Sequence, residues 1–190
     1  MNSPSSAPLT IRKVETAEDY KAFFEFPWIV HKEDPHWVPP LLSMRKEILD
    51  KEKGASWEYI EGDYFGAWRG DTLVGIIAAF VSHRHNQFND DNASWWGLFE
   101  CYNDQEAATA LLNIACEWGE KRGYSRILGP ANMTLHEECG LLIDNFDDPV
   151  VLMPYNPPYY QNLVENAGFE KAMDVVSFYY EREFGTVRRR

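Results

Sequence analysis

The chain has 190 residues, of which 45% are hydrophobic and 15% aromatic, and its formal net charge is -12. This composition is typical of a globular protein with a sizeable core, and the length fits one domain. The acidic balance argues against nucleic acid and anionic membrane surfaces as partners, because both repel a negatively charged chain. No apolar run reaches the roughly 20 residues of a membrane-spanning helix, so no transmembrane segment is predicted.

The cysteines indicate the cellular compartment, and the composition of the two ends of the chain indicates the bounds of the domain. An odd number of cysteines without CxxC spacing predicts free, buried thiols in a reducing compartment, so we expect a cytoplasmic protein. Residues 1–8 are small and polar and predict a flexible leader. Residues 182–190 predict a flexible basic tail, which leaves one domain over residues 9–181. The three cysteines are Cys101, Cys116 and Cys139.

The first third of the chain predicts one strand and two helices. Residues 9–14 alternate in polarity as a strand does. Thr16 followed by an acidic turn is a typical helix start, and we expect this helix to end before Pro27, because proline removes a helical hydrogen bond. A second helix is predicted over residues 41–53, with Pro40 at its first helical position.

Three strands are predicted in the middle of the chain. Residues 63–69 and 72–84 are joined by a turn typical of a hairpin, and the second strand is apolar on both faces, as a central strand is. A third strand covers residues 94–102. Gly97 within it indicates a bulge or a close approach of another backbone.

Two histidines are predicted near the end of the second of these strands. His83 and His85 would share one face, because side chains alternate along a strand. Two histidines on one face could act as two ligands of a metal ion, but no third ligand lies near them in the sequence. We therefore expect no metal site.

The clearest helical pattern covers residues 105–122 and ends at Gly123. A short buried strand follows over residues 125–128. Because a helix connects it to residues 94–102, we expect these two strands to lie parallel as neighbours. The apolar residues at helical spacing are Ala108, Leu111, Leu112, Ala115, Trp118 and Gly119.

The last third predicts a strand over residues 150–153, a short helix that carries two tyrosines and stops at Gly168, and a final strand over residues 174–180. In this order the elements resemble the GNAT superfamily of acyltransferases. The resemblance implies an α/β fold with a mixed central sheet flanked by helices on both faces.

A narrower resemblance is to a family of uncharacterised bacterial GNAT-like proteins. That family is similar to proteins implicated in bacterial ceramide synthesis, in which an acyl chain is moved to a long-chain amine. The motifs that carry it are Phe26-Pro27-Trp28, Asp34-Pro35-His36-Trp37-Val38-Pro39-Pro40-Leu41, Gly97-Leu98-Phe99-Glu100, Leu128-Gly129-Pro130, Gly140-Leu141-Leu142-Ile143-Asp144 and Tyr155-Asn156-Pro157-Pro158-Tyr159-Tyr160.

The resemblance implies catalytic roles for two residues, and the residue type suggests a third. Glu100 falls where many GNAT enzymes place a general base, and such a base needs burial to raise its pKa. Tyr160 falls where they place a tyrosine that protonates the leaving thiolate, although one of the two adjacent tyrosines is expected to pack in the core. His136 lies beside two glutamates in a long polar insertion, and a histidine beside carboxylates can act as a base or as a metal ligand. The alternatives are an exposed carboxylate at the strand end and a surface histidine.

For cofactor binding, the resemblance implies a pyrophosphate site at the N-terminus of the helix over residues 105–122. A glycine-rich loop usually forms it, but residues 101–107 contain no glycine or arginine. Asn103 and Glu106 have the spacing of a capping box. The alternative is therefore that side chains of this protein, and not a phosphate, accept the N–H groups at the helix start. The cofactor-binding candidates are Cys101, Asn103, Asn156 and Tyr159.

Two functions are therefore expected. The first is an N-acyltransferase that moves an acyl group from acyl-CoA, acetyl-CoA or another thioester to a small-molecule or lipid-like amine. The second is a non-catalytic module that binds a ligand or partner, and the loop over residues 103–107 favours it. We also expect a cleft lined by Glu100, Asn156 and Tyr160, and a homodimer that covers exposed apolar surface.

Overall fold

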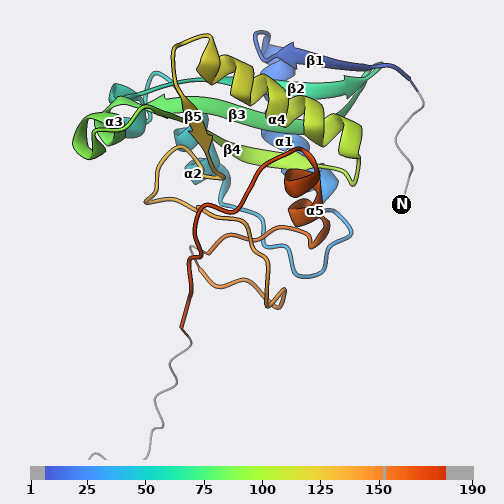
Figure 1. Ribbon diagram of the computed structural model, residues 1–190. Helices are drawn as coiled ribbons and strands as arrows, with labels where there is room; N and C mark the ends of the chain where they lie inside the picture. Colours follow the sequence, from blue (N-terminus) through green and yellow to red (C-terminus); the bar gives the residue numbers. More distant parts are fainter. Residues whose placement is uncertain (1–6, 152, 179–190) are drawn as a thin grey trace, which may run out of the picture.

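The computed structural model describes residues 7–151 and 153–178. In this part of the chain, five strands form one sheet in the order β1-β2-β3-β4-β5 (Figure 1). The first four are antiparallel, and β5 is parallel to β4, as the sequence predicts. The strands are β1 (Leu9–Lys13), β2 (Ile60–Arg69), β3 (Thr72–Ser82), β4 (Ala93–Cys101) and β5 (Arg126–Leu128).

Helices cover both faces of this mixed sheet, which confirms the predicted architecture. The helices α4 and α5 pack on one face, around a core that includes Trp96 and Leu111. Helices α1 and α2 close a second core on the other face, around Phe23 and Leu49 (Figure 1). The bounds are α1 (Ala17–Val30), α2 (Leu42–Leu49), a 3-10 turn η1 (Ala55–Glu58), α3 (His83–Asn89), α4 (Gln105–Glu120) and α5 (Tyr159–Asn166).

Helix α1 begins as predicted and ends later than predicted. Thr16 and Asp19 form a reciprocal capping box at its start. The helix continues through Pro27, which has no N–H to donate to the Phe23 carbonyl. Arg45 replaces that donor: its Nη2 lies 3.2 Å from the Phe23 oxygen.

Helix α2 supplies Arg45 and also departs from its prediction. It begins at Leu42 rather than at Pro40, because Leu41 is its extended N-cap residue, and it ends at Leu49. Arg45 is 8% exposed, and its Nε donates to the Phe24 carbonyl at 2.9 Å. Burial lowers the pKa of Arg45 to about 10, so the guanidinium stays charged at neutral pH. It binds α1 to α2 through main-chain oxygens.

The prediction that His83 and His85 share one face of a strand is wrong. β3 ends at Ser82, whose side chain accepts the His85 N–H and caps helix α3. His83 and His85 face the separate carboxylates of Glu61 and Asp91, at 3.9 and 3.6 Å. Within the described ranges, no group of three or more potential metal-ligating side chains is found.

Helix α4 packs with the predicted face inward. Leu111, Leu112 and Ala115 are fully buried, and Trp118 is 4% exposed. The Trp118 indole also donates to Asp63 at 2.9 Å, which joins the helix to β2. No described helix is both long and apolar enough to span a bilayer.

The two strands predicted in the last third do not form in the described residues. Residues 150–151, 153 and 174–178 are not in strands, and residues 152 and 179–180 lie outside the described ranges. Val151 and Phe178 are 87% and 89% exposed. A strand needs a partner, and an apolar sequence alone does not provide one. The flanking segments 1–6 and 182–190 also lie outside the described residues.

Candidate functional site

The site is built on a bulge in the central strand β4. Ile76 and Ala78 of β3 face Glu100 and Gly97 of β4, so one residue of β3 opposes two of β4. Leu98, inside the bulge, has the left-handed φ of 47°. The Gly97 prediction is confirmed, because a Cβ there would lie 1.6 Å from the Ala131 oxygen.

The bulge ends at Glu100, whose carboxylate is held by two side chains. His31 Nε2 lies 2.6 Å from Glu100 Oε2, and the Tyr160 hydroxyl donates to the same oxygen at 2.8 Å. No hydrogen bond to Oε1 is found within residues 7–151 and 153–178. The Glu100 side chain is 21% exposed, so a carboxylate with one oxygen fixed by two partners is still partly accessible.

His31 is a member of this site that the sequence did not reveal. It is the C-cap residue of α1 and is 2% exposed. Its ring stacks on Trp37, with centroids 5.0 Å apart. The local signal was only a histidine just after an apolar helix, since its partner Glu100 is 69 positions away.

Tyr160 and Tyr159, at the start of α5, connect Glu100 to the backbone of the next residue. The Tyr160 oxygen accepts the Cys101 N–H at 2.9 Å, and the Tyr159 hydroxyl donates to the Cys101 carbonyl at 2.9 Å. Burial, and then the charge of Glu100, raises the pKa of Tyr160 well above its ordinary value. Burial likewise raises the pKa of Tyr159. Both phenols are therefore neutral at physiological pH, and the Tyr160 hydroxyl donates its proton to Glu100.

The start of α4 differs from the predicted capping box between Asn103 and Glu106. The N-cap residue is Asp104, which accepts the Ala107 N–H at 3.2 Å, and Asn103 is exposed. Arg69 of β2 forms a two-pronged ion pair with Asp104 and also binds Glu106 at 2.6 Å. Burial alone would raise the pKa of Asp104, but the hydrogen bonds from Arg69 and the helix start leave it lowered.

Among the described residues, no hydrogen bond links the remaining predicted site residues to Glu100. Asn156 is 6% exposed and exchanges two hydrogen bonds with the Leu142 backbone, which holds the long insertion in place. His136 is exposed, and its N–H donates to Thr134. The structure thus brings Glu100, Cys101, Tyr159 and Tyr160 together, and leaves Asn103, Asn156 and His136 outside this hydrogen-bonded group.

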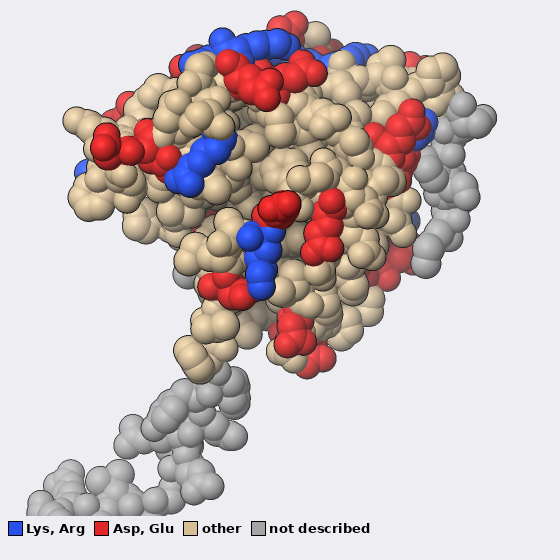
Figure 2. Space-filling model, viewed as in Figure 1, with Lys and Arg blue, Asp and Glu red and all other residues tan. Residues whose placement is uncertain are grey.

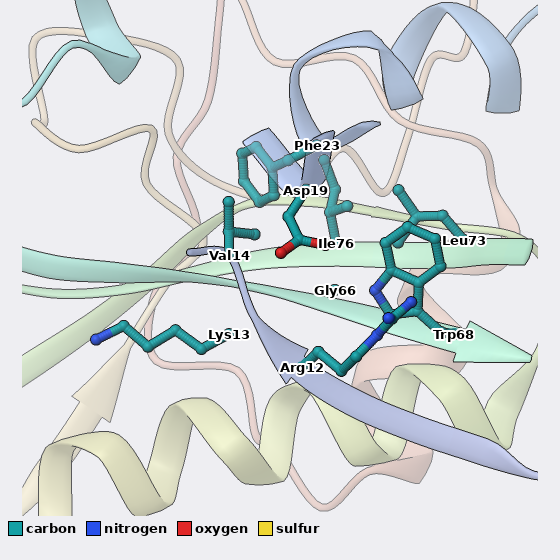
Figure 3. A pocket seen from close by; sticks show the side chains of 9 residues that line it. All are labelled: Arg12, Lys13, Val14, Asp19, Phe23, Gly66, Trp68, Leu73 and Ile76. Carbon is teal, nitrogen blue, oxygen red and sulfur yellow. The ribbon is translucent and has the colours of Figure 1, made fainter. Parts of the chain in front are cut away.

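Two hollows lie elsewhere on the surface. A hollow of about 1100 Å³ lies beside β5 and the segments that follow it, and its lining does not include Glu100 or Tyr160. A small one lies between β1 and α1, where Arg12 covers the Trp68 ring at 4.0 Å and Asp19 caps α1 (Figure 3). The charged groups of this small hollow already have partners, so it is not assigned a function.

The chain has the GNAT acyltransferase fold. An aminoglycoside acetyltransferase from an uncultured soil metagenomic sample, in complex with trehalose, matches with a TM-score of 0.55 and 13% identity, over 92% of this chain and 97% of that chain. The aminoglycoside N-acetyltransferase AAC(6')-Iy in complex with CoA matches with a TM-score of 0.53 and 15% identity, over 95% and 99%.

Two curated proteins are similar in sequence. Protein YghO of Escherichia coli (strain K12) is 30% identical over 173 residues, which is 90% of this chain and 44% of that protein. The bacterial ceramide synthase of Caulobacter vibrioides (strain NA1000 / CB15N) is 30% identical over 176 residues, 92% of this chain and 46% of the relative. The chain therefore spans less than half the length of both relatives. No protein-family model matches it.

Proposed function

We propose that the chain is an N-acyltransferase domain that moves an acyl group from a thioester to an amine. The observation that carries the proposal is the Glu100 carboxylate, which is fixed through Oε2 by His31 and Tyr160 while its side chain stays partly exposed. A carboxylate held in one orientation and partly shielded from water is suited to general base catalysis. The names of the similar proteins, a ceramide synthase and two acetyltransferases, are consistent with this chemistry.

In the proposed reaction, Glu100 Oε1 accepts a proton from the attacking amine. The amine nitrogen forms a bond to the thioester carbonyl carbon, and the carbon–sulfur bond breaks. The thiolate leaves with the electron pair and takes up a proton. His31 and Tyr160 orient the Glu100 carboxylate, and hydrogen bonds to its Oε2 stabilise the negative charge. The sequence-based role of Tyr160 as the acid remains a prediction, because its proton is directed to Glu100.

The proposed donor is acyl-CoA, acetyl-CoA or another thioester, and the proposed acceptor is a small or lipid-like amine. Fold likeness alone does not assign a substrate, and the structural neighbours' aminoglycosides belong to those proteins. A cytoplasmic location and a single domain over residues 9–181 complete the proposal.

The second candidate is a non-catalytic module that binds a ligand or partner. The specific observation in its favour is the closed start of α4, where Arg69, Asp104 and Glu106 pair with one another. The Cys101 backbone also favours this alternative. Its N–H and C=O are both hydrogen-bonded to tyrosines, so neither is free to bind a thioester substrate.

Acyl transfer to a panel of amines, followed by mass spectrometry, separates the two candidates. Glu100→Gln keeps the shape and removes the base, so we expect kcat/KM to fall by about 10²–10⁴-fold. The matched control is Glu117→Gln, an exposed carboxylate on α4, which should leave the rate unchanged. Equal rates for Glu100→Gln and the unmodified chain, or no transfer from any thioester, would reject the enzyme proposal.

A further inference from the structure

At the junction between β4 and α4, the N-terminus of a long helix lies close in sequence to Glu100. α4 has 16 residues and starts at Gln105, after β4 ends at Cys101. The first N–H groups of such a helix are unpaired, and together with the helix dipole they bind anions, phosphates in particular. In this chain, three charged side chains already gather there.

The first of these, Asp104, takes the place of an external anion. Its side chain is 6% exposed, and Oδ1 accepts the Ala107 N–H. The hydrogen bonds from the Arg69 Nε and Nη2 atoms to its two oxygens measure 2.9 and 3.1 Å. A carboxylate of the chain itself therefore already occupies the helix start and accepts one of its N–H groups.

Arg69 has its donors engaged as well. Besides Asp104, its Nη2 reaches Glu106 at 2.6 Å and its Nη1 donates to the Ala7 carbonyl at 3.2 Å. One guanidinium faces two carboxylates, so the cluster keeps a net negative charge. A phosphate that approached it would meet Glu106, which is 68% exposed, and would be repelled.

The edge of β4 next to this cluster is also closed. Unpaired main-chain groups of a strand edge can hold an extended ligand. At Cys101, however, the Tyr160 oxygen accepts the N–H and the Tyr159 hydroxyl donates to the carbonyl. Farther along the strand, the Asn132 side chain accepts the Leu98 N–H at 3.0 Å.

We propose that Arg69, Asp104 and Glu106 are specificity-determining residues that exclude pyrophosphate from the α4 N-terminus. The acyl donor is then recognised by its thioester end, and the nucleotide of a coenzyme contributes nothing at this point of the fold. This inference rests on the acyl-transfer function proposed above. It predicts that a short thioester without phosphate serves as well as the matching coenzyme A ester.

Two experiments with the full chain test this inference. In the first, kcat/KM is compared for octanoyl-CoA and octanoyl-N-acetylcysteamine, which share the thioester and differ in the phosphates. We expect the two values to agree within about threefold. In the second, calorimetry measures binding of inorganic pyrophosphate to the unmodified chain and to the double variant Asp104→Asn/Glu106→Gln. The asparagine side chain of this variant would still cap the helix.

We expect pyrophosphate to bind the double variant at least about tenfold more tightly than the unmodified chain, because Arg69 is freed. Glu106→Gln alone, a change at an exposed side chain, provides a second variant that keeps the Arg69–Asp104 pair and should show a smaller gain. The inference is overturned if the unmodified chain binds pyrophosphate as tightly as the variants, or prefers octanoyl-CoA by more than about a hundredfold. Absence of turnover with both thioesters would reject the proposed function instead, and the calorimetry would still decide this inference.

Discussion

Arg45 shows how one buried side chain permits an irregular helix. Pro27 leaves the Phe23 carbonyl without its helical donor, and Arg45 supplies a donor to it and to the Phe24 carbonyl. The guanidinium also lies 5.7 Å from the rings of Phe24 and Trp28. A buried cation bonded only to main-chain oxygens is therefore a structural part of the α1–α2 layer.

Replacement of this side chain tests that role. Arg45→Met keeps the aliphatic length and removes the donors, so the buried Phe23 carbonyl loses its donor and the Phe24 carbonyl loses one hydrogen bond. We expect a loss of about 2–4 kcal/mol in the free energy of unfolding. Urea titration followed by fluorescence measures it. The control is Lys46→Met, the next residue of α2, which is exposed. Similar midpoints for the two variants would contradict the role of Arg45.

The ion pair of Asp104 predicts how stability depends on pH. The folded-state pKa of Asp104 is lowered, so its contribution to stability is complete above the ordinary aspartate pKa and is lost as the pH falls below about 4. Asp104→Asn keeps the cap and lacks this titration. Urea unfolding at about pH 7 and about pH 3 should show a smaller acid loss for this variant than for the unmodified chain. The control Asp71→Asn, at an exposed turn, should retain the full acid loss.

Only part of the candidate site was predictable from sequence. Glu100 and Tyr160 belong to recognisable local motifs, and the structure joins them at 2.8 Å. Arg69 and His31 meet their partners across 35 and 69 positions of sequence. Such contacts depend on strand register and on the path of α1, neither of which follows from local pattern.

At the scale of elements, most helices and strands that are fixed by nearby residues were predicted correctly, and those that depend on distant residues were not. Helix α4 has a buried face at regular spacing, and its prediction is confirmed. The hairpin of β2 and β3 and the short β5 are also found where expected. The α1 end and α3 were misjudged because Arg45 and the Ser82 cap, respectively, decide them. The strands predicted in the last third need distant partners that local sequence does not reveal.

The bulge of β4 yields a prediction about packing of elements. Gly97 lies against the Ala131 oxygen, so Gly97→Ala would push apart β4 and the segment that follows β5. We expect it to destabilise the fold by at least about 2 kcal/mol more than Gly123→Ala. Gly123 is a suitable comparison because its Cβ position is open and only its φ of 84° disfavours a side chain. Equal unfolding midpoints would show that the close approach is not retained in solution.

At the scale of the molecule, charge and apolar surface are distributed unevenly. In Figure 2 several basic side chains gather at the top of the view beside acidic ones, while acidic side chains and a few basic ones are scattered over the rest of that face. Apolar exposure is concentrated in two stretches of sequence: residues 38–44, and the C-terminal apolar segment, residues 173–178. The exposed residues are Val38, Leu41, Leu42 and Met44 in the first, and Met173, Val175, Val176 and Phe178 in the second.

The C-terminal apolar segment predicts that the chain associates with itself. Its four apolar side chains are 68–89% exposed, and exposed apolar groups gathered in one segment favour association. We expect light scattering to give a mass above 22.1 kDa that rises with concentration, as a homodimer forms. Val176→Asp places a charge in the segment and should shift the equilibrium to the monomer, because a paired surface would have to bury that charge. Phe88→Asp is the control, since Phe88 on α3 is 88% exposed and far from the segment in sequence. A monomer mass for the unmodified chain over a wide concentration range would show that the segment stays solvent-exposed.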